Sequence, residues 1–230
     1  MTAAARVAEF SPALGTQLQL ELVADPSVGE KRLAVAATAA LHDPHKTART
    51  LASLARSAKE DPKFRVTAAE AAAGFDRELG VDALVSLAAD TVFEQRFGAI
   101  LVLERFDRQH AAKQLRRIAS DASEPLSLRF DAVDVLWDLD PDAARPQLRA
   151  IFAALLLPDS RPFDLIERVG AKDPGFAASL LKVLALSHRL PAAYRIRAAD
   201  LLRRYDRHQA AKVQARLAAD PVVTAYRQAH

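Results

Sequence analysis

Pairs of arginine and aspartate recur along this 230-residue chain at a fixed step of eleven residues. An arginine and an aspartate can form charge-assisted hydrogen bonds, which either join two segments or hold a ligand of opposite charge. The pairs are Arg32 and Asp43, Arg65 and Asp76, Arg96 and Asp107, Arg129 and Asp140, and Arg195 and Asp206. Because an active site is needed only once, five copies of one pair favour a structural ladder. We expect each arginine to reach an aspartate at a neighbouring unit's turn.

Patterns typical of enzymes and metal sites are weak in this sequence. The six histidines are scattered, and His42 and His45 flank Asp43 without a third ligand nearby. The chain contains no cysteine, no G-x-S-x-G or H-E-x-x-H motif and no phosphate-binding glycine loop. We therefore expect a non-enzymatic protein with no catalytic residues, no metal site and no cofactor.

The positions of these pairs define a repeat. Asp173 belongs to a further unit, in which Pro162 stands where the arginine is expected. Successive units then start 33, 31, 33, 33 and 33 residues apart. A period of this length is typical of solenoids, in which each unit buries its apolar face against its neighbours.

Apolar residues at helical spacing predict two helices in each unit, with the aspartate at the turn between them. The expected first helices are 28–41, 63–75, 92–106, 126–139, 161–172 and 192–205. Their partners are 45–59, 79–89, 109–120, 142–157, 175–188 and 208–219.

The expected repeats cover nearly the whole chain, so residues 1–230 are predicted to form one repeat domain. Full repeats are expected at about 28–61, 62–90, 92–121, 126–158, 161–188 and 192–220. Residues 1–25 fit the same register with Ser11 at the turn, as a unit that begins just after its arginine. Either this short unit is a natural cap, or the chain was cut from a longer array.

Composition limits the class of protein. Half of the residues are apolar, aromatic residues are few, and the formal net charge is only +3. The N-terminus has no apolar stretch long enough for a signal peptide, and no run of 18 apolar residues follows. These features predict a soluble cytoplasmic protein without a membrane partner, whose oligomeric state the sequence leaves open.

The order of an arginine, paired alanines, a leucine, an aspartate at a turn and a second leucine-bearing helix resembles HEAT repeats. The closest resemblance is to the short phycobilisome-lyase-like variety, and it covers nearly the whole chain. It implies an all-α, right-handed α-solenoid of about six to seven helix pairs. Proteins of this kind are mostly scaffolds and protein-binding modules, some of them attached to bacterial signalling or defence assemblies.

The resemblance also implies that second helices line the concave face of the array. Cations on these helices include Arg116, Arg117, Arg149 and Lys182, which would form a basic stripe for an anionic partner. That partner could be an acidic protein surface or, as a less favoured choice, a nucleic acid. The alternative is an ordinary solvated face, because Asp82 interrupts the row.

The fifth unit is irregular and is preceded by the most apolar segment of the chain, which includes Leu156. An exposed patch containing Leu156 and Phe163 would mark a partner site. The alternative is that a loop covers it, with Phe163 packed on Leu156.

The sequence thus favours a non-catalytic scaffold, adaptor or sensor module that binds a protein partner on a concave, partly basic face. The alternative is a nucleic-acid-binding HEAT-like protein such as an alkylpurine DNA glycosylase. Enzymes of that class use aromatic side chains, an aspartate and cations in the groove, and here only Trp137 and Asp138 could correspond. With no second tryptophan in the chain, we expect Trp137 to be a packing residue.

Overall fold

The computed structural model describes residues 11–92, 94–154 and 161–229. The expected helix at the very start of the chain, residues 1–10, lies outside this range. The chain divides into two compact units, Met1–Leu115 and Arg116–His230, with the boundary inside one helix.

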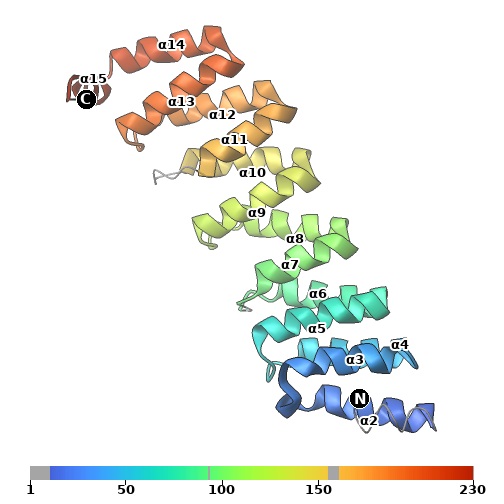
Figure 1. Cartoon of the computed structure of the whole chain (residues 1–230). Coiled ribbons are helices and arrows are strands. Elements are labelled where there is room, and N and C mark those ends of the chain that lie inside the picture. Colours follow the sequence, from blue (N-terminus) through green and yellow to red (C-terminus); the bar gives the residue numbers. More distant parts are fainter. Residues whose placement is uncertain (1–10, 93, 155–160, 230) are drawn as a thin grey trace. The chain divides into compact units, whose positions relative to one another are not determined.

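The described residues form fourteen α-helices, one 3-10 helix and no strand (Figure 1). Helices before the aspartates are α3 (Arg32–Ala40), α5 (Pro62–Phe75), α7 (Arg96–Phe106), α9 (Leu126–Leu139), α11 (Arg161–Lys172) and α13 (Ala192–Tyr205). Helices after them are α4 (Pro44–Arg56), α6 (Arg77–Ala89), α8 (Arg108–Ser120), α10 (Pro141–Ala154), α12 (Pro174–Leu186) and α14 (Arg207–Ala218). The others are α2 (Pro12–Ala24), the 3-10 helix η1 (Pro26–Lys31) and α15 (Pro221–Ala229).

Helices pack against their neighbours in sequence. In the first unit α2 contacts α3, and the series continues through α4, α5 and α6 to α7. In the second unit α9 contacts α10, and α11, α12, α13 and α14 form a similar chain of contacts. Second helices also contact one another directly, as α4 does with α6, α10 with α12 and α12 with α14. Each unit is therefore a helical repeat array, and the protein is an all-α solenoid.

The core consists of the apolar faces of the first and second helices, which pack against one another. Second helices of five repeats bury a leucine eight residues after the aspartate, at Leu51, Leu84, Leu115, Leu148 and Leu181. The sixth repeat has Gln214 at this position, half-buried and hydrogen-bonded to Asp200 at 3.1 Å. Apolar burial thus stabilises contacts between repeats, while the side of α14 that carries Gln214 is polar.

Two glycines allow helices to approach closely. A Cβ added to Gly80 would lie 2.0 Å from the backbone nitrogen of Ala73, so α6 and α5 touch backbone to backbone there. A Cβ on Gly170 would lie 2.3 Å from the ring of Tyr205, which covers α11 at this point. Any other residue at Gly80 would force α5 and α6 apart, and one at Gly170 would displace the Tyr205 ring.

Each repeated aspartate begins a second helix. Its side chain accepts a hydrogen bond from the backbone N–H three residues later, which satisfies one of the unpaired donors at the helix start. These donors are Lys46, Leu79, His110, Ala143, Phe176 and Gln209, at 2.9 to 3.2 Å from the aspartate oxygen. The aspartates are therefore N-caps within their own repeats.

The repeated arginines connect repeats in a way the sequence did not predict. Their Nε atoms donate to carbonyl oxygens in the last turn of the preceding second helix, where carbonyls lack helical partners. The contacts are Arg32 to Val23 (2.7 Å), Arg65 to Ala55 (2.8 Å), Arg129 to Ala119 (3.1 Å) and Arg195 to Ala185 (3.2 Å).

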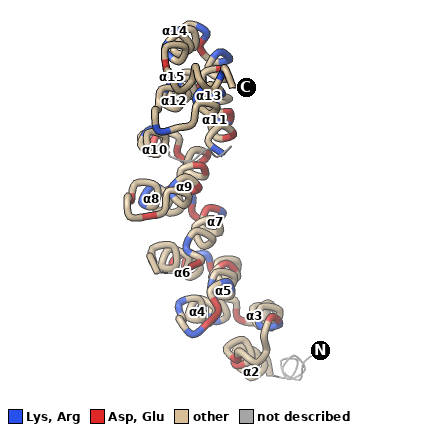
Figure 2. The backbone as a smooth tube through the Cα atoms, turned by 90° about the vertical axis from the view of Figure 1, so that its left-hand side faces the viewer, with Lys and Arg blue, Asp and Glu red and all other residues tan. Residues whose placement is uncertain are grey.

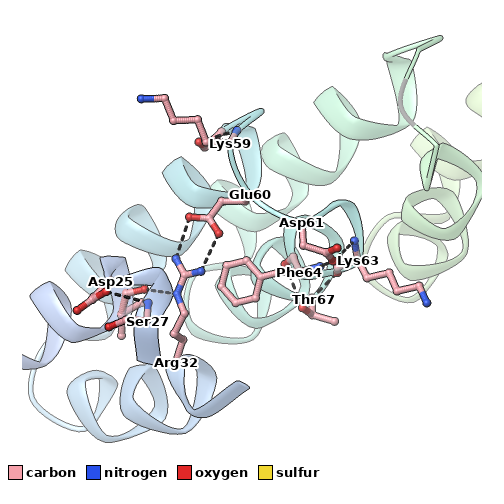
Figure 3. A network of polar contacts seen from close by, with 11 residues as sticks. Asp25, Ser27, Arg32, Lys59, Glu60, Asp61, Lys63, Phe64 and Thr67 are labelled. Carbon is pink, nitrogen blue, oxygen red and sulfur yellow. Dashed lines mark hydrogen bonds and ion pairs between the residues drawn. The ribbon is translucent and has the colours of Figure 1, made fainter. Parts of the chain in front are cut away.

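Two of these arginines, Arg32 and Arg195, also form ion pairs with acidic side chains. Arg32 also binds both carboxylate oxygens of Glu60, at 2.7 and 2.9 Å, and lies over the ring of Phe64 (Figure 3). Arg195 binds Asp220 at 2.7 Å. Both acids lie in the turn that closes the arginine's own repeat. The expected contact with an aspartate at a neighbouring unit's turn is thus wrong for these two, because each guanidinium lies beside the last turn of the preceding second helix and the closing turn of its own repeat.

Several helix boundaries differ from expectation; α4, for example, ends at Arg56 rather than at residue 59. Residues 28–31 are not α-helical, because Gly29 adopts a positive φ of 61° inside η1 and the α-helix begins only at Arg32. Helix α7 begins at Arg96 rather than at residue 92. Helix α15, which packs on α13 and α14, was not expected at all.

Candidate functional site

The second helices of unit Arg116–His230 carry an excess of positive charge. Their described residues include eight cations, namely Arg116, Arg117, Arg145, Arg149, Lys182, Arg207, Lys212 and Arg216. Asp142 is the one acidic residue among the same described residues. Such an imbalance attracts anionic partners over a distance of about 8 to 10 Å at physiological salt.

Three of these cations occupy equivalent positions, nine residues after the aspartate of their repeat. They are Arg116 on α8, Arg149 on α10 and Lys182 on α12, and we refer to them as the basic row. All three are exposed and form no ion pair with any described residue. Packed helices lie about 8 to 10 Å apart. Because α10 packs against α12, Arg149 and Lys182 are expected to lie about 8 to 10 Å apart.

Arg149 is held in place by an aromatic ring. Its guanidinium carbon lies 5.3 Å from the ring centroid of Phe176, which Arg145 approaches from 5.2 Å. Arg145 also pairs with Asp173, whose hydrogen bond raises the pKa of Arg145. Arg145 is thus occupied by an internal acid, whereas Arg149 keeps its donors free and is oriented by a cation–π contact.

The first helices of the same unit carry both signs of charge (Figure 2), and charges of α9 and α11 pair across repeats. Arg168 of α11 bonds Asp134 of α9 at 2.5 Å and also Asp138. Lys172 bonds Asp138 at 3.0 Å, and Arg161 bonds Asp131 at 3.1 Å. Helices α9 and α11 therefore largely neutralise one another, whereas α13 carries four arginines and one aspartate.

The two acids around Arg168 differ in their protonation equilibria. Burial raises the pKa of Asp134, and the charge of Arg168 only partly offsets this. Burial also opposes ionisation of Asp138, but the hydrogen bond from Lys172 and the charge of Arg168 outweigh it and lower the pKa of Asp138. Arg168, which replaces an apolar residue of other repeats, is accounted for by these contacts.

Unit Met1–Leu115 lacks a comparable row. Asp82 of α6 lies six residues after its aspartate, where α4 has Arg49, and it pairs with Arg56 of α4 at 2.5 Å. Arg49 itself donates to His45, which bonds Asp76 at 2.6 Å. The interruption expected at Asp82 is present, and the position nine residues after the aspartate is Ala52 in α4 and Val85 in α6, so the basic row does not extend to these helices.

The two residues expected to form an exposed apolar partner site are Phe163 and Leu156. Phe163 is only 2% exposed, and its ring lies 4.6 Å from that of Tyr194 with Arg197 above it at 4.3 Å. The expectation of an exposed Phe163 is therefore wrong, because α13 covers this side chain. Leu156 lies outside the described residues.

Trp137 is a packing residue in the structure. It is 1% exposed and stacks on Phe176 with a centroid distance of 5.8 Å. Its indole N–H has no hydrogen-bond partner among the described residues. Asp138 points outward instead, to Arg168 and Lys172. The two residues therefore do not form a common aromatic and acidic surface.

Metal-type donors are also dispersed. Within the described residues, no three histidine, aspartate or glutamate side chains gather closely enough to hold a metal ion. His110 instead bonds the capping Asp107 of its own helix at 2.8 Å. No helix in the described part of the chain is both long and apolar enough to cross a bilayer.

A pocket of about 580 Å³ lies where α12, α14 and α15 meet. Leu186, Leu217, Pro221 and Val222 give it apolar walls, and Arg216 lies at its border. The buried pair of Arg195 and Asp220 forms another part of the wall. Sequence reasoning missed this pocket, because it depends on the unexpected α15; Asp220-Pro221 before a short apolar stretch was the available signal.

A second hollow, of about 650 Å³, is lined by Arg203, Arg204 and Arg207 with Ala211 and Gln214. Arg204 is also 3.7 Å from Glu167. These arginines are exposed, and the hollow has no buried charged group. It adds to the polar side of α13 and α14 on which Gln214 lies.

Searches of protein families, of curated proteins and of solved structures found no match for this chain. The functional conclusion therefore depends on the residues themselves.

Proposed function

We propose that this protein is a non-catalytic interaction module that binds an acidic protein segment along the second helices of residues 116–230. It would serve as a cytoplasmic scaffold, adaptor or sensor, in keeping with the resemblance to HEAT repeats. The observation that carries the proposal is the contrast in charge between the two helix sets. The charges of the first helices α9 and α11 are largely paired with one another, while the second helices keep eight cations against one acid in their described residues.

The geometry of the basic row favours an extended peptide as the partner. A chain in the polyproline II conformation advances about 3.1 Å per residue with three residues per turn, so every third side chain recurs on the same face at about 9 Å. This is close to the separation of about 8 to 10 Å expected between Arg149 and Lys182 on the packed helices α10 and α12. Glutamates at every third position would therefore meet the three cations in turn.

A charge reversal tests the proposal. We expect Arg116→Glu, Arg149→Glu and Lys182→Glu together to weaken binding of a fluorescein-labelled peptide, with glutamate at every third position, by at least about tenfold. Exposed ion pairs contribute about 0.2 to 1 kcal/mol each, and reversal adds repulsion. Fluorescence anisotropy at low salt measures the affinity.

The matched control reverses Lys31, Lys59 and Lys63, which are exposed and form no ion pair with the described residues. This control changes the net charge equally, so equal loss of binding in both triple variants would sink the proposed site. Duplex DNA of the same total charge is the competing probe. If DNA binds more tightly than the peptide and loses affinity in the row variant, the nucleic-acid alternative replaces the proposal.

A further inference from the structure

The pocket between α12, α14 and α15 lies next to the basic row. Leu186, in its wall, follows Lys182 by four residues on α12, so the two share one helix face and are separated by about one turn of 5.4 Å. Arg216 continues the positive charge onto α14, at the border of the same pocket. A peptide that follows the row past Lys182 would reach the pocket within about two residues.

The lining of the pocket combines apolar surface with one available cation. Leu217 is buried at its base, whereas Val222 is 65% exposed at the start of α15. Arg216 is exposed and forms no ion pair with any described residue. Apolar walls with a few placed polar groups are typical of ligand pockets, and a volume of about 580 Å³ lies in their usual range of about 300 to 1,000 Å³.

The acid in the wall does not oppose an anionic ligand strongly. Asp220 is neutralised by Arg195 at 2.7 Å, and it also accepts backbone hydrogen bonds from Val222 and Val223. The hydrogen bond from Arg195 is the first reason why the pKa of Asp220 is lowered. Arg216 therefore provides the uncompensated charge at this border, and it is positive.

We infer that this pocket binds an aliphatic side chain of the acidic peptide segment, with a neighbouring carboxylate held by Arg216. This inference rests on the proposed function and adds a specificity site to it. The basic row selects for negative charge, and the pocket selects among acidic segments for one with an aliphatic residue just beyond the last glutamate.

The test uses the whole chain and pairs of amide-capped peptides. Each peptide has glutamate at every third position. Two residues beyond the last of these glutamates stands either a leucine or an alanine, and a further glutamate follows it. Versions that carry this leucine or alanine pair at the N-terminal or at the C-terminal end cover both binding orientations. We expect the better leucine peptide to bind about tenfold more tightly than its alanine partner, because an aliphatic side chain is buried. In methyl NMR spectra, the leucine peptide should shift Leu186, Leu217 and Val222, and the alanine peptide should not.

Two variants check the location. Val222→Asn makes the exposed border polar and should reduce the leucine preference to about threefold or less, while Leu41→Asn, at an exposed residue of the first unit, should leave it unchanged. Equal affinity for leucine and alanine peptides, or methyl shifts elsewhere, would overturn the pocket inference and leave the basic row standing. Failure of both peptides to bind would overturn the proposed function, and the pocket inference with it.

Discussion

A buried arginine is tolerated only where its donors find acceptors, because desolvation of an unpaired charge costs several kcal/mol. Arg195 meets this condition by bonding a backbone carbonyl of α12 and the carboxylate of Asp220. Its side chain is 4% exposed and that of Asp220 is 9% exposed. One side chain thereby connects the end of one repeat to the closing turn of the next.

Replacing this arginine should destabilise the protein strongly. Arg195→Leu removes the buried cation from the Asp220 carboxylate and the donor from the Ala185 carbonyl, and we expect a loss of about 3 to 5 kcal/mol in the free energy of unfolding. Urea unfolding followed by circular dichroism measures it. The exposed Arg203→Leu is the control and should change stability by less than about 0.5 kcal/mol. Similar losses in both variants would contradict the buried contact.

Acid should unfold the protein through its capping carboxylates. The pKa of Asp107 is lowered first by the backbone N–H of His110, and that of Asp173 by the backbone N–H of Phe176. The side chain of His45 likewise lowers the pKa of Asp76. A carboxyl whose pKa is lower when folded binds its proton more readily when unfolded, so protonation favours unfolding. The resulting stability is complete above the ordinary carboxyl pKa of about 4 and is lost below it.

We therefore expect the melting temperature to change little between about pH 5 and 8 and to fall steeply below about pH 4. Asparagine also caps helices but does not titrate, so Asp173→Asn should make the acid-induced fall shallower. Asp164→Asn, at an exposed position of α11, should follow the parent curve. A steeper fall for Asp173→Asn would contradict the sign of this effect.

At the scale of the element, periodicity alone locates most helices. The expected 126–139 and 192–205 coincide with α9 and α13, because apolar spacing, a proline just before each helix and an aspartate just after it are encoded within about 15 residues. Contacts between repeats are not encoded locally. The burial of Phe163 depends on Tyr194 and Arg197, about 30 residues later. The acid that each arginine would reach was likewise not readable from spacing.

The close contact between α5 and α6 at Gly80 can be tested by substitution, with Gly74 of α5 as the control position. Gly80→Ala places a methyl group against the backbone of Ala73, and we expect a loss of about 1 to 3 kcal/mol in the free energy of unfolding. Gly74→Ala, on the neighbouring helix α5, meets no atom within 4 Å and should stabilise by up to about 1 kcal/mol, since alanine favours helix. The measurement is the urea midpoint of both variants. A neutral Gly80→Ala would show that α5 and α6 can separate freely.

At the scale of the molecule, a net charge of only +3 conceals a separation of charge between helix sets. The sequence showed the cations of the basic row at equivalent positions. It did not show that charges of α9 and α11 would be paired across repeats, because that pairing depends on how neighbouring helices pack. The structure thereby distinguishes available cations such as Arg149 from occupied ones such as Arg145.

Peptide binding by the basic row should depend on salt. Raising the ionic strength from 50 to 200 mM is expected to weaken the glutamate peptide on the order of tenfold, since exposed charges are screened. The triple variant of the basic row should lose this salt dependence, whereas the lysine control should keep it. Anisotropy titrations at four salt concentrations give the slope. An unchanged slope in the row variant would place the binding cations elsewhere.

Gln214 has a consequence for how copies of this protein behave together. Where five repeats bury a leucine, the sixth presents an amide beside Arg203 and Arg207. A leucine at this position would make this side of α14 apolar, like the surfaces through which neighbouring repeats pack. Copies of the protein could then associate head to tail into filaments. Because Gln214, Arg203 and Arg207 make this surface polar, high protein concentration should not drive fibre growth through it.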